Sequence, residues 1–241
     1  MTNNGGKDLD MALSGKGMLV IMTDIPSADE ADFNRWYDRE HTQERVAIPG
    51  FVRARRWVLA EGKAPKYLAL YETETFEVLS SGPYKAALAA QTQWSKDVMG
   101  RFQNVARSVA RITLAEGLGS GGVIAVIRLR PEPGAEDALR PAVEKGLREI
   151  VGEPGIVSGF LLESDPELSK PLPEHKVAPG EDASRDWLVC IEGTSADAAL
   201  AAVGRKLPTA SLGAKVIVQA SYSLMWGLTR TEMEREGVLG A

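Results

Sequence analysis

One short segment, residues 33–51, gathers the side chains in this chain that are best suited to transferring protons. His41 is one of only two histidines among 241 residues. An imidazole with an ordinary pKa of about 6.5 can accept or donate a proton near neutral pH. Glu44 lies three residues after His41 and Asp38 three residues before it, so both carboxylates are within helical reach of the ring. This spacing predicts an acid–base site in which His41 moves the proton and Glu44 or Asp38 orients the ring.

Arginines and aromatic side chains near this histidine could bind the molecule on which it acts. A guanidinium can hold a carboxylate, enolate or phenolate, and the arginines placed for that role are Arg45 and Arg53. The arginines and the aromatic residues each have a structural interpretation as well. Arginines on an edge strand discourage aggregation, and aromatic residues more often fill a core. The aromatic residues that could wall a pocket for a flat ligand are Trp36, Tyr37, Trp57 and Tyr71.

The pattern of residues 33–48 predicts one amphipathic helix that ends at Pro49-Gly50 and leads into a strand. Stepping about 100° per residue places Glu40 and Glu44 near the middle of the apolar face, with His41 close to its edge. Ionisable groups on a buried face are costly unless they are paired. The helix is therefore expected either to cover a satisfied polar cluster or to line a cavity. In the first case His41 is a structural residue that secures the following turn.

The order of elements in the first half of the chain recurs in the second half. A short apolar segment bounded by Gly and Pro occurs at 17–26 and again at 122–131. Pro49-Gly50 has its counterpart in Pro154-Gly155, at the same offset of 105 residues. Each half is predicted to follow a β-α-β-β-α-β order, the split βαβ or ferredoxin-like unit. The predicted fold class is α+β, with two ferredoxin-like βαββαβ repeats packed sheet to sheet as a pseudo-dimeric α+β barrel.

The predicted boundaries follow from this repeat. They are a disordered tail at 1–16, a first half at 17–118, a linker at 119–122, a second half at 123–228 and a C-terminal tail at 229–241. A Pro-rich insertion at 164–184 lengthens the second hairpin and contains His175. Long loops of this kind are lids, partner arms or disordered segments, and the sequence leaves a lid and a disordered loop as alternatives.

The two halves differ most at the positions of the candidate site. At the offset of 105 residues, His41 corresponds to Gly146 and Arg45 to Ile150. The second helix fills the same place with an apolar stripe, so packing alone does not require the ionisable residues of the first helix. The first half is therefore the one expected to carry the functional site.

Composition and charge exclude several classes of partner. The net charge of −5 does not favour binding to nucleic acid. No apolar run approaches about 18 residues, so no membrane span is expected. The single cysteine, Cys190, excludes an internal disulfide framework and a cysteine-based zinc site, and it fits a reducing cytoplasm. The carboxylates beside His41 do not form a recognised zinc spacing, so no metal is expected.

The segment Trp36-Tyr37-x-x-x-His41-x-x-x-Arg45-x-x-x-Pro49-Gly50-Phe51, after a first strand, resembles the dimeric α+β barrel superfamily and more narrowly its EthD-like group. The resemblance covers the first half, and the second half only by strand order. Members of the superfamily include cofactor-free monooxygenases, muconolactone-type isomerases, polyketide cyclases and stress-response proteins. In most of them two chains make the barrel, whereas here the two halves could do so, and association of two such chains as a homodimer stays open.

The resemblance implies a cofactor-free enzyme that acts by acid–base chemistry on a small hydrophobic organic acid or phenol, as an isomerase, a lyase or a monooxygenase. The alternative is a non-catalytic barrel that binds a small ligand or acts in a stress response. A tandem chain of this length is also similar to the haem-binding chlorite dismutase group. Those proteins use a second-half histidine as axial ligand, and here the only such residue is His175 in the Pro-rich loop.

Overall fold

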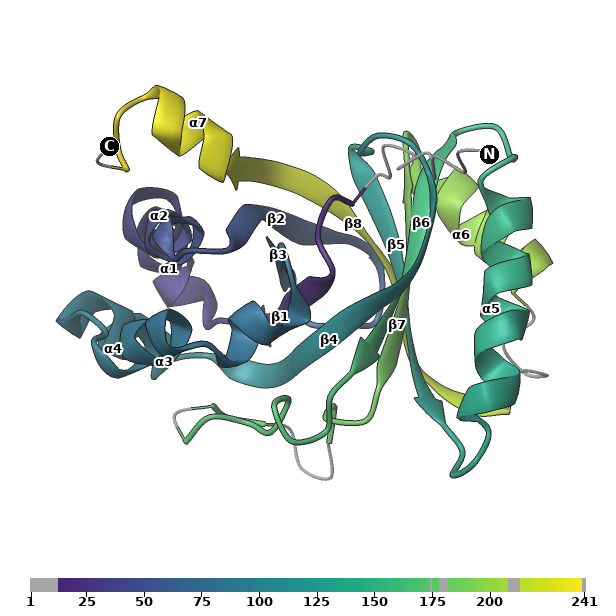
Figure 1. Ribbon diagram of the computed structural model, residues 1–241, viewed down its shortest axis with the longest axis horizontal. Helices are drawn as coiled ribbons and strands as arrows, with labels where there is room; N and C mark the ends of the chain where they lie inside the picture. The colour runs from purple at the N-terminus through teal and green to yellow at the C-terminus, as the bar shows by residue number, and fades with distance from the viewer. Residues whose placement is uncertain (1–12, 174, 178–181, 208–212, 240–241) are drawn as a thin grey trace, which may run out of the picture.

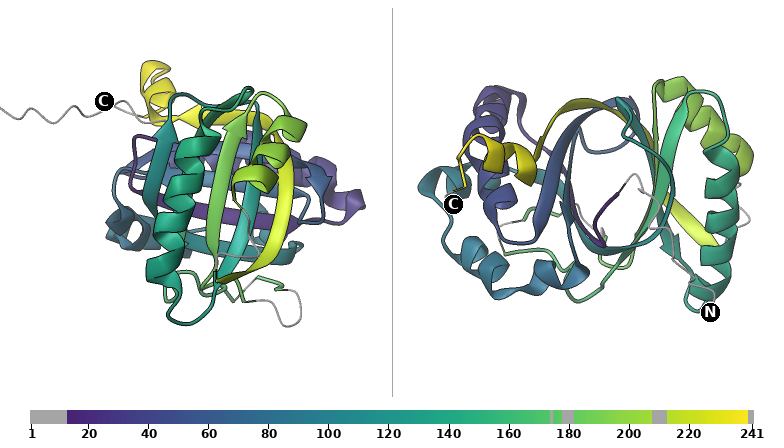
Figure 2. Two further views of the ribbon diagram at one scale, coloured as in Figure 1. Left: turned by 90° about the vertical axis from the view of Figure 1, so that its right-hand side faces the viewer. Right: turned by 45° about the horizontal axis from the view of Figure 1, so that its top comes forward.

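Eight antiparallel strands close into one barrel, in the order β1-β3-β2-β8-β5-β7-β6-β4. The computed structural model describes residues 13–173, 175–177, 182–207 and 213–239. Helices lie outside the barrel on two opposite sides, as Figure 1 and Figure 2 show. The expected mixed α+β class with a closed barrel is therefore confirmed.

The first half places its helices against the outer face of strands β4, β1, β3 and β2. The turn from these helices into β2 is made at Gly50, whose φ of +87° is a backbone conformation that glycine adopts without strain. The elements of this half are β1 (Gly17–Asp24), η1 (Ser27–Asp29), α1 (Glu30–Trp36), η2 (Tyr37–His41), α2 (Thr42–Ala47), β2 (Phe51–Gly62), β3 (Tyr67–Thr73), η3 (Phe76–Ser80), α3 (Gly82–Ala89), α4 (Gln93–Met99) and β4 (Gln103–Gly117).

The second half has the same order of strands and main helices, and a last short helix follows it. Strand β8 pairs with β2 and strand β6 pairs with β4, which joins the two halves into one barrel. The elements are β5 (Val123–Pro131), α5 (Glu136–Ile150), β6 (Ile156–Ser164), β7 (Trp187–Gly193), α6 (Ala196–Lys206), β8 (Ala214–Thr229) and α7 (Arg230–Arg235).

Three hydrophobic clusters stabilise the fold. One lies under the helices of the first half, one under α5 and α6, and one inside the barrel. The interior cluster includes Trp57, Phe160 and Tyr222, each fully buried. These large side chains fill the barrel interior, so the cavity described below lies elsewhere, between the first sheet and its helices.

Both ends of the chain pack more closely than the sequence predicts. Leu13 is 1% exposed and belongs to the interior cluster, and the Gly15 N–H donates to Glu72 Oε1 at 2.6 Å. Residues 1–12 of the expected tail lie outside the described residues. At the other end, α7 folds back beside α2 (Figure 1). The segment expected as a C-terminal tail from Thr229 therefore contains an ordered helix.

The described part of the long connection between β6 and β7, residues 165–173, 175–177 and 182–186, crosses from the second half to the edge of the first. In Figure 1 it runs below β4 toward α3. Hydrogen bonds tie these residues to β4. Among them, the Asp165 N–H donates to the Val109 carbonyl at 2.8 Å, the Val109 N–H to Ser169 Oγ at 2.8 Å, and the Val105 N–H to the Lys176 carbonyl at 3.1 Å. We call this connection the strap.

Candidate functional site

A π-helical turn interrupts the helix that carries the candidate site. Residues Tyr37–His41 form this turn between α1 and α2, and the Thr42 N–H donates to the Tyr37 carbonyl, five residues back. The turn rotates all following residues relative to a regular α-helix, and such insertions are frequent at functional sites. As a result His41 and Arg45 both border the pocket between helix and sheet.

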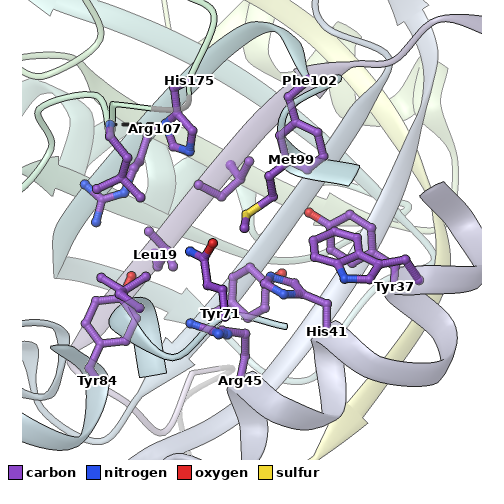
Figure 3. A pocket seen from close by; sticks show the side chains of 15 residues that line it. Leu19, Tyr37, His41, Arg45, Tyr71, Tyr84, Met99, Phe102, Arg107 and His175 are labelled. Carbon is purple, nitrogen blue, oxygen red and sulfur yellow. Dashed lines mark hydrogen bonds between the residues drawn. The ribbon is translucent and has the colours of Figure 1, made fainter. Parts of the chain in front are cut away.

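This pocket is a narrow slot between the helices of the first half and the outer face of its sheet (Figure 3). Most of its wall is aromatic or apolar, and includes Leu19, Trp36, Tyr84, Met99 and Phe102. The atom-free space is about 480 Å3 with its open mouth, but only about 40 Å3 of it can take the centre of a water molecule. A flat molecule must therefore widen the slot as it enters, and the flexible side chain of Met99 can yield.

The imidazole of His41 lies among aromatic rings. Its centroid is 4.1 Å from that of Trp36, with 26° between the planes, and it meets Tyr37 edge-on at 5.4 Å. Nδ1 is buried and has no hydrogen-bond partner among the described residues. Burial, and then the positive charges of Arg45 and Arg56, hold the pKa of His41 well below its ordinary value. The ring is therefore a neutral base at physiological pH.

Arg45 and Tyr71 add two more incompletely paired polar groups to the same slot. The Arg45 side chain is 5% exposed. Among the described residues its nearest carboxylate is Glu44 at 3.9 Å, and its Nε has no hydrogen-bond partner. The Tyr71 hydroxyl also lacks a partner of hydrogen-bonding geometry, although Tyr37 is close enough to affect its titration. Burial and the neighbouring Tyr37 raise the pKa of Tyr71 well above its ordinary value, so its phenol stays protonated.

Arg56 contacts the Tyr37 ring, which in turn packs against His41. Its guanidinium lies 3.9 Å from the centroid of Tyr37, and it donates to Asn34 Oδ1 at 2.9 Å and Asp38 Oδ1 at 3.3 Å. These contacts fix the orientation of the Tyr37 ring, which meets His41. No local sequence pattern indicates this aromatic environment of Arg56.

Five of the residues expected at the site do lie together around the slot. They are Trp36, Tyr37, His41, Arg45 and Tyr71. Figure 3 shows His41, Arg45 and Tyr71 turned toward one another. The geometry thus agrees with the expected grouping, while the role of each residue stays a proposal.

The expected carboxylates lie elsewhere. Asp38 accepts from Trp226 Nε1 at 2.7 Å and from Arg56, so it ties the helix to β8 and does not orient His41. Glu44 lies outside the slot, is 34% exposed, and forms a 3.9 Å ion pair with Arg45. Glu40 accepts from Thr92 Oγ1 at 2.6 Å and secures α4. Because the π-turn rotates the helix, the expected placement of Glu40 and Glu44 in the middle of the buried face is wrong.

Two other expected binding residues also lie away from the slot. Arg53 donates to Glu72 Oε2 at 2.6 Å and to Ser120 Oγ at 3.1 Å, near the junction of the halves. Trp57 is fully buried inside the barrel. Both residues therefore have structural surroundings, as the alternative reading of the sequence allowed.

Sequence reasoning missed other residues that line the slot. Arg107 comes from β4, and Leu172 and His175 come from the strap. Alternation along β4 places Arg107 on the same face as Val105 and Val109, which belong to the cluster under the first-half helices. The alternation along β4 could therefore have identified Arg107 as a residue facing the helices. No sequence pattern indicates that the strap docks on β4, because this contact depends on how the two halves close the barrel.

The corresponding place in the second half is filled. Gly146, at the position that corresponds to His41, lies so close to the end of α6 that an added Cβ would be 3.0 Å from the Lys206 carbonyl oxygen and 2.4 Å from Leu207 Cδ2. The fully buried side chains of Leu139, Val143 and Leu147 occupy the same layer. Close helix packing therefore replaces the slot in this half.

No protein-family model and no curated protein sequence matches this chain. Solved structures match its fold at low sequence identity. One is an anthrone oxidase-like protein, with a TM-score of 0.57, 12% identity, and 90% of this chain and 94% of that chain covered. A second, classed provisionally as a monooxygenase from Fusobacterium nucleatum, has a TM-score of 0.53 and 10% identity, with coverages of 90% and 98%.

A third neighbour is a haem-binding protein from Thermus thermophilus, with a TM-score of 0.50, 12% identity, and coverages of 95% of this chain and 96% of that chain. At such identities the likeness shows the fold alone. The chain shares with these neighbours an α+β fold, built here as a closed antiparallel barrel with helices outside it. None of the described helices is long and apolar enough to cross a membrane, and the described residues contain no cluster of His, Cys, Asp and Glu suited to a metal ion.

Proposed function

We propose that this chain is a cofactor-free enzyme that removes a proton from a small planar organic acid or phenol bound in the slot of the first half. One observation carries the proposal. His41 Nδ1, Arg45 Nε and the Tyr71 hydroxyl are buried, lack hydrogen-bond partners among the described residues, and border the same apolar cavity. Buried polar groups without partners are costly, so their concentration in one cavity indicates a ligand that completes their hydrogen bonds.

The electrostatics of the slot keep His41 unprotonated and favour an anion beside Arg45. A neutral imidazole with a depressed pKa accepts a proton from an acidic O–H or an activated C–H and becomes an imidazolium. The guanidinium of Arg45 then balances the negative charge left on the enolate or phenolate. The protonated Tyr71 can donate a hydrogen bond to the same oxygen. Isomerisation, lyase chemistry and reaction with dioxygen all follow from such an anion.

The structural neighbours support this class of chemistry. Two of them are described as anthrone oxidase-like and as a provisional monooxygenase. An anthrone is a flat three-ring ketone with an acidic C–H, so it matches a slot whose walls are largely aromatic. The likeness does not choose among isomerase, lyase and monooxygenase.

Haem is a second ligand to consider, because one neighbour is named as haem-binding. The slot does not fit this group. A macrocycle needs a pocket on the order of several hundred Å3, whereas about 40 Å3 here can take the centre of a water molecule. A ligand of two or three fused rings requires much less widening.

A non-catalytic ligand-binding barrel is the alternative function. The narrowness of the slot and the stacking of Trp36 on His41 favour it, because both features also describe a packed polar cluster. The two functions differ in what the loss of His41 removes. An enzyme loses turnover, whereas a binding protein loses affinity or stability alone.

We also propose that the halves are tandem repeats with the boundaries given by the sequence. Glu72 of β3 and Glu192 of β7 support this origin, because each accepts a backbone N–H, from Gly15 and from Gly121. Each also accepts from an arginine of β2, Arg53 for Glu72 and Arg55 for Glu192. The EthD-like assignment, a cytoplasmic location and a homodimer stay predictions.

Turnover of 1,8-dihydroxyanthrone tests the proposed function. In the presence of dioxygen the reaction yields the anthraquinone and water, and absorbance follows it directly. His41→Gln is expected to lower kcat by about 100-fold or more, because general-base catalysis contributes at least that factor. Tyr71→Phe removes the proposed hydrogen bond to the ligand oxygen and should also lower kcat. Tyr222→Phe is its matched control, since Tyr222 is buried inside the barrel and donates to the Pro65 carbonyl. Unchanged turnover in a folded His41→Gln variant contradicts the proposal, and binding without turnover supports the alternative.

A further inference from the structure

The slot carries two buried positive charges and no negative one. Its described lining includes Arg45 and Arg107, and none of the lining residues is Asp or Glu. A buried arginine normally pairs with a carboxylate, as Arg55 does with both oxygens of Glu192 at 2.8 and 2.6 Å. Among the described residues, Arg45 is approached only at 3.9 Å by Glu44, which lies outside the slot lining, so an anion in the slot adds the charge compensation that Arg107 lacks.

Arg107 has a position suited to binding such an anion. It is 6% exposed, and its Nη1 donates to the carbonyls of Leu168 and Lys170 in the strap. Among the described residues no carboxylate pairs with it. Arg111, four residues further along β4, is more exposed and pairs with Glu77 at 3.5 Å. The strap thus holds the Arg107 guanidinium by neutral oxygens, which fix its position and leave its charge uncompensated.

The two charged ends of the slot are separate. Figure 3 shows His41, Arg45 and Tyr71 on one side, and Arg107 beside His175 on the other, with Leu19 between them. Each arginine faces the same cavity from a different element, Arg45 from α2 and Arg107 from β4. A ligand that reaches both ends needs an apolar ring system with an acidic group at each end.

We propose that Arg107 is a second anion-binding residue and that the ligand is an aromatic hydroxy acid whose carboxylate lies remote from its acidic hydroxyl. The hydroxyl meets His41 and Arg45, and the carboxylate meets Arg107. This inference rests on the proposed function, because it assigns the substrate class of the same slot. It also gives the strap a role, since the strap positions the guanidinium.

Binding of three related naphthols tests the assignment by calorimetry. The probes are 2-naphthol, 6-hydroxy-2-naphthoate with a remote carboxylate, and 3-hydroxy-2-naphthoate with an adjacent one. The remote carboxylate is expected to tighten binding about tenfold or more over 2-naphthol, the gain of one charge-assisted contact. The adjacent carboxylate is expected to gain less. Arg107→Met should remove the advantage, measured within the variant as the ratio of its affinities for 6-hydroxy-2-naphthoate and 2-naphthol.

Three variants separate the charge of Arg107 from its structural contacts. Arg107→Lys keeps the charge and should retain part of the advantage. Arg111→Met lies on the same strand outside the slot and should retain all of it. Ser169→Ala removes the bonds of Ser169 Oγ to Val109 but keeps the guanidinium, and it should also retain the advantage. If Arg111→Met loses as much as Arg107→Met, the advantage does not depend on the arginine in the slot, and the assignment is overturned.

The failure of this inference is distinguishable from failure of the proposed function. If 2-naphthol binds in a manner that depends on His41, but the remote carboxylate adds nothing, the Arg107 assignment alone is overturned. An advantage that survives in Arg107→Met overturns it as well. If none of the naphthols binds, the proposed function fails and this inference fails with it.

Discussion

Trp36 and His41 stack with ring centroids 4.1 Å apart, although they are five residues apart in one helical segment. On a regular α-helix, residues at this separation point in directions about 140° apart. The π-turn at Tyr37–His41 removes most of that angle and brings the two rings onto one face. The same local change makes His41 a buried neutral base and moves Glu44 to the helix surface.

The depressed pKa of His41 makes stability depend on pH. Below about 6.5 the unfolded chain binds a proton on this imidazole, whereas the folded chain does not until the pH reaches its much lower native pKa. Stability due to neutral His41 is therefore complete above about pH 6.5 and is lost as the pH falls, by up to about 1.4 kcal/mol per unit. Urea unfolding of the wild type and of His41→Gln between pH 7.5 and 5 measures this difference.

The comparison of the wild type with His41→Gln is internally controlled, because every other titrating group is common to both proteins. The wild type should lose stability faster on acidification than His41→Gln. Parallel pH profiles would show that the imidazole is protonated to the same extent in the folded and unfolded chains. That result would contradict a buried neutral ring.

Asp38 should matter for stability and not for turnover. Its carboxylate accepts from Trp226 Nε1 and Arg56, and removal leaves both donors without this acceptor. Asp38→Ala is expected to lower the free energy of unfolding by about 1–3 kcal/mol. The kcat for 1,8-dihydroxyanthrone should stay within about threefold of the wild type, a change of under 1 kcal/mol in the barrier. A large loss of kcat at unchanged stability would return Asp38 to the catalytic group.

Arg230 should stabilise the end of the helix that carries the site. Its Nη1 donates to the carbonyls of Val46, Ala47 and Ile48, each at 3.2 Å. A cation at a helix C-terminus is favourable, so Arg230→Met is expected to cost about 1–2 kcal/mol. Arg235→Met, on the same α7, is the matched control, because Arg235 is 71% exposed and its one ion pair among the described residues is with Glu236. Equal melting temperatures for the two variants would refute this role of α7.

The fold was largely predictable because it depends on patterns that recur along the chain. The apolar segment 17–26 and its counterpart at 122–131 contain β1 and β5, and the element order gave the closed barrel. The packing of Leu13 and the helix α7 were not predictable in this way. Both depend on the space that the closed barrel leaves, and no local pattern records it.

The candidate site was predictable in part, for a different reason. Residue types gave His41, Arg45 and the aromatic wall, because these are unusual in a helix that only packs. The positions of Glu40, Glu44 and Asp38 were wrong because a regular period of about 3.6 residues was assumed across a π-turn. Arg107 was missed because its binding role depends on the strap from the other half.

A crystal structure of the complex with 1,8-dihydroxyanthrone, prepared without oxygen, tests the central claim most directly. The account predicts the rings in the slot beside Trp36, with one ligand oxygen or the acidic carbon within hydrogen-bonding reach of His41 Nδ1, and an oxygen within about 3.2 Å of Arg45 Nε. A saturated crystal that shows the slot closed, or the ligand bound elsewhere with His41 Nδ1 paired to the protein, would contradict it.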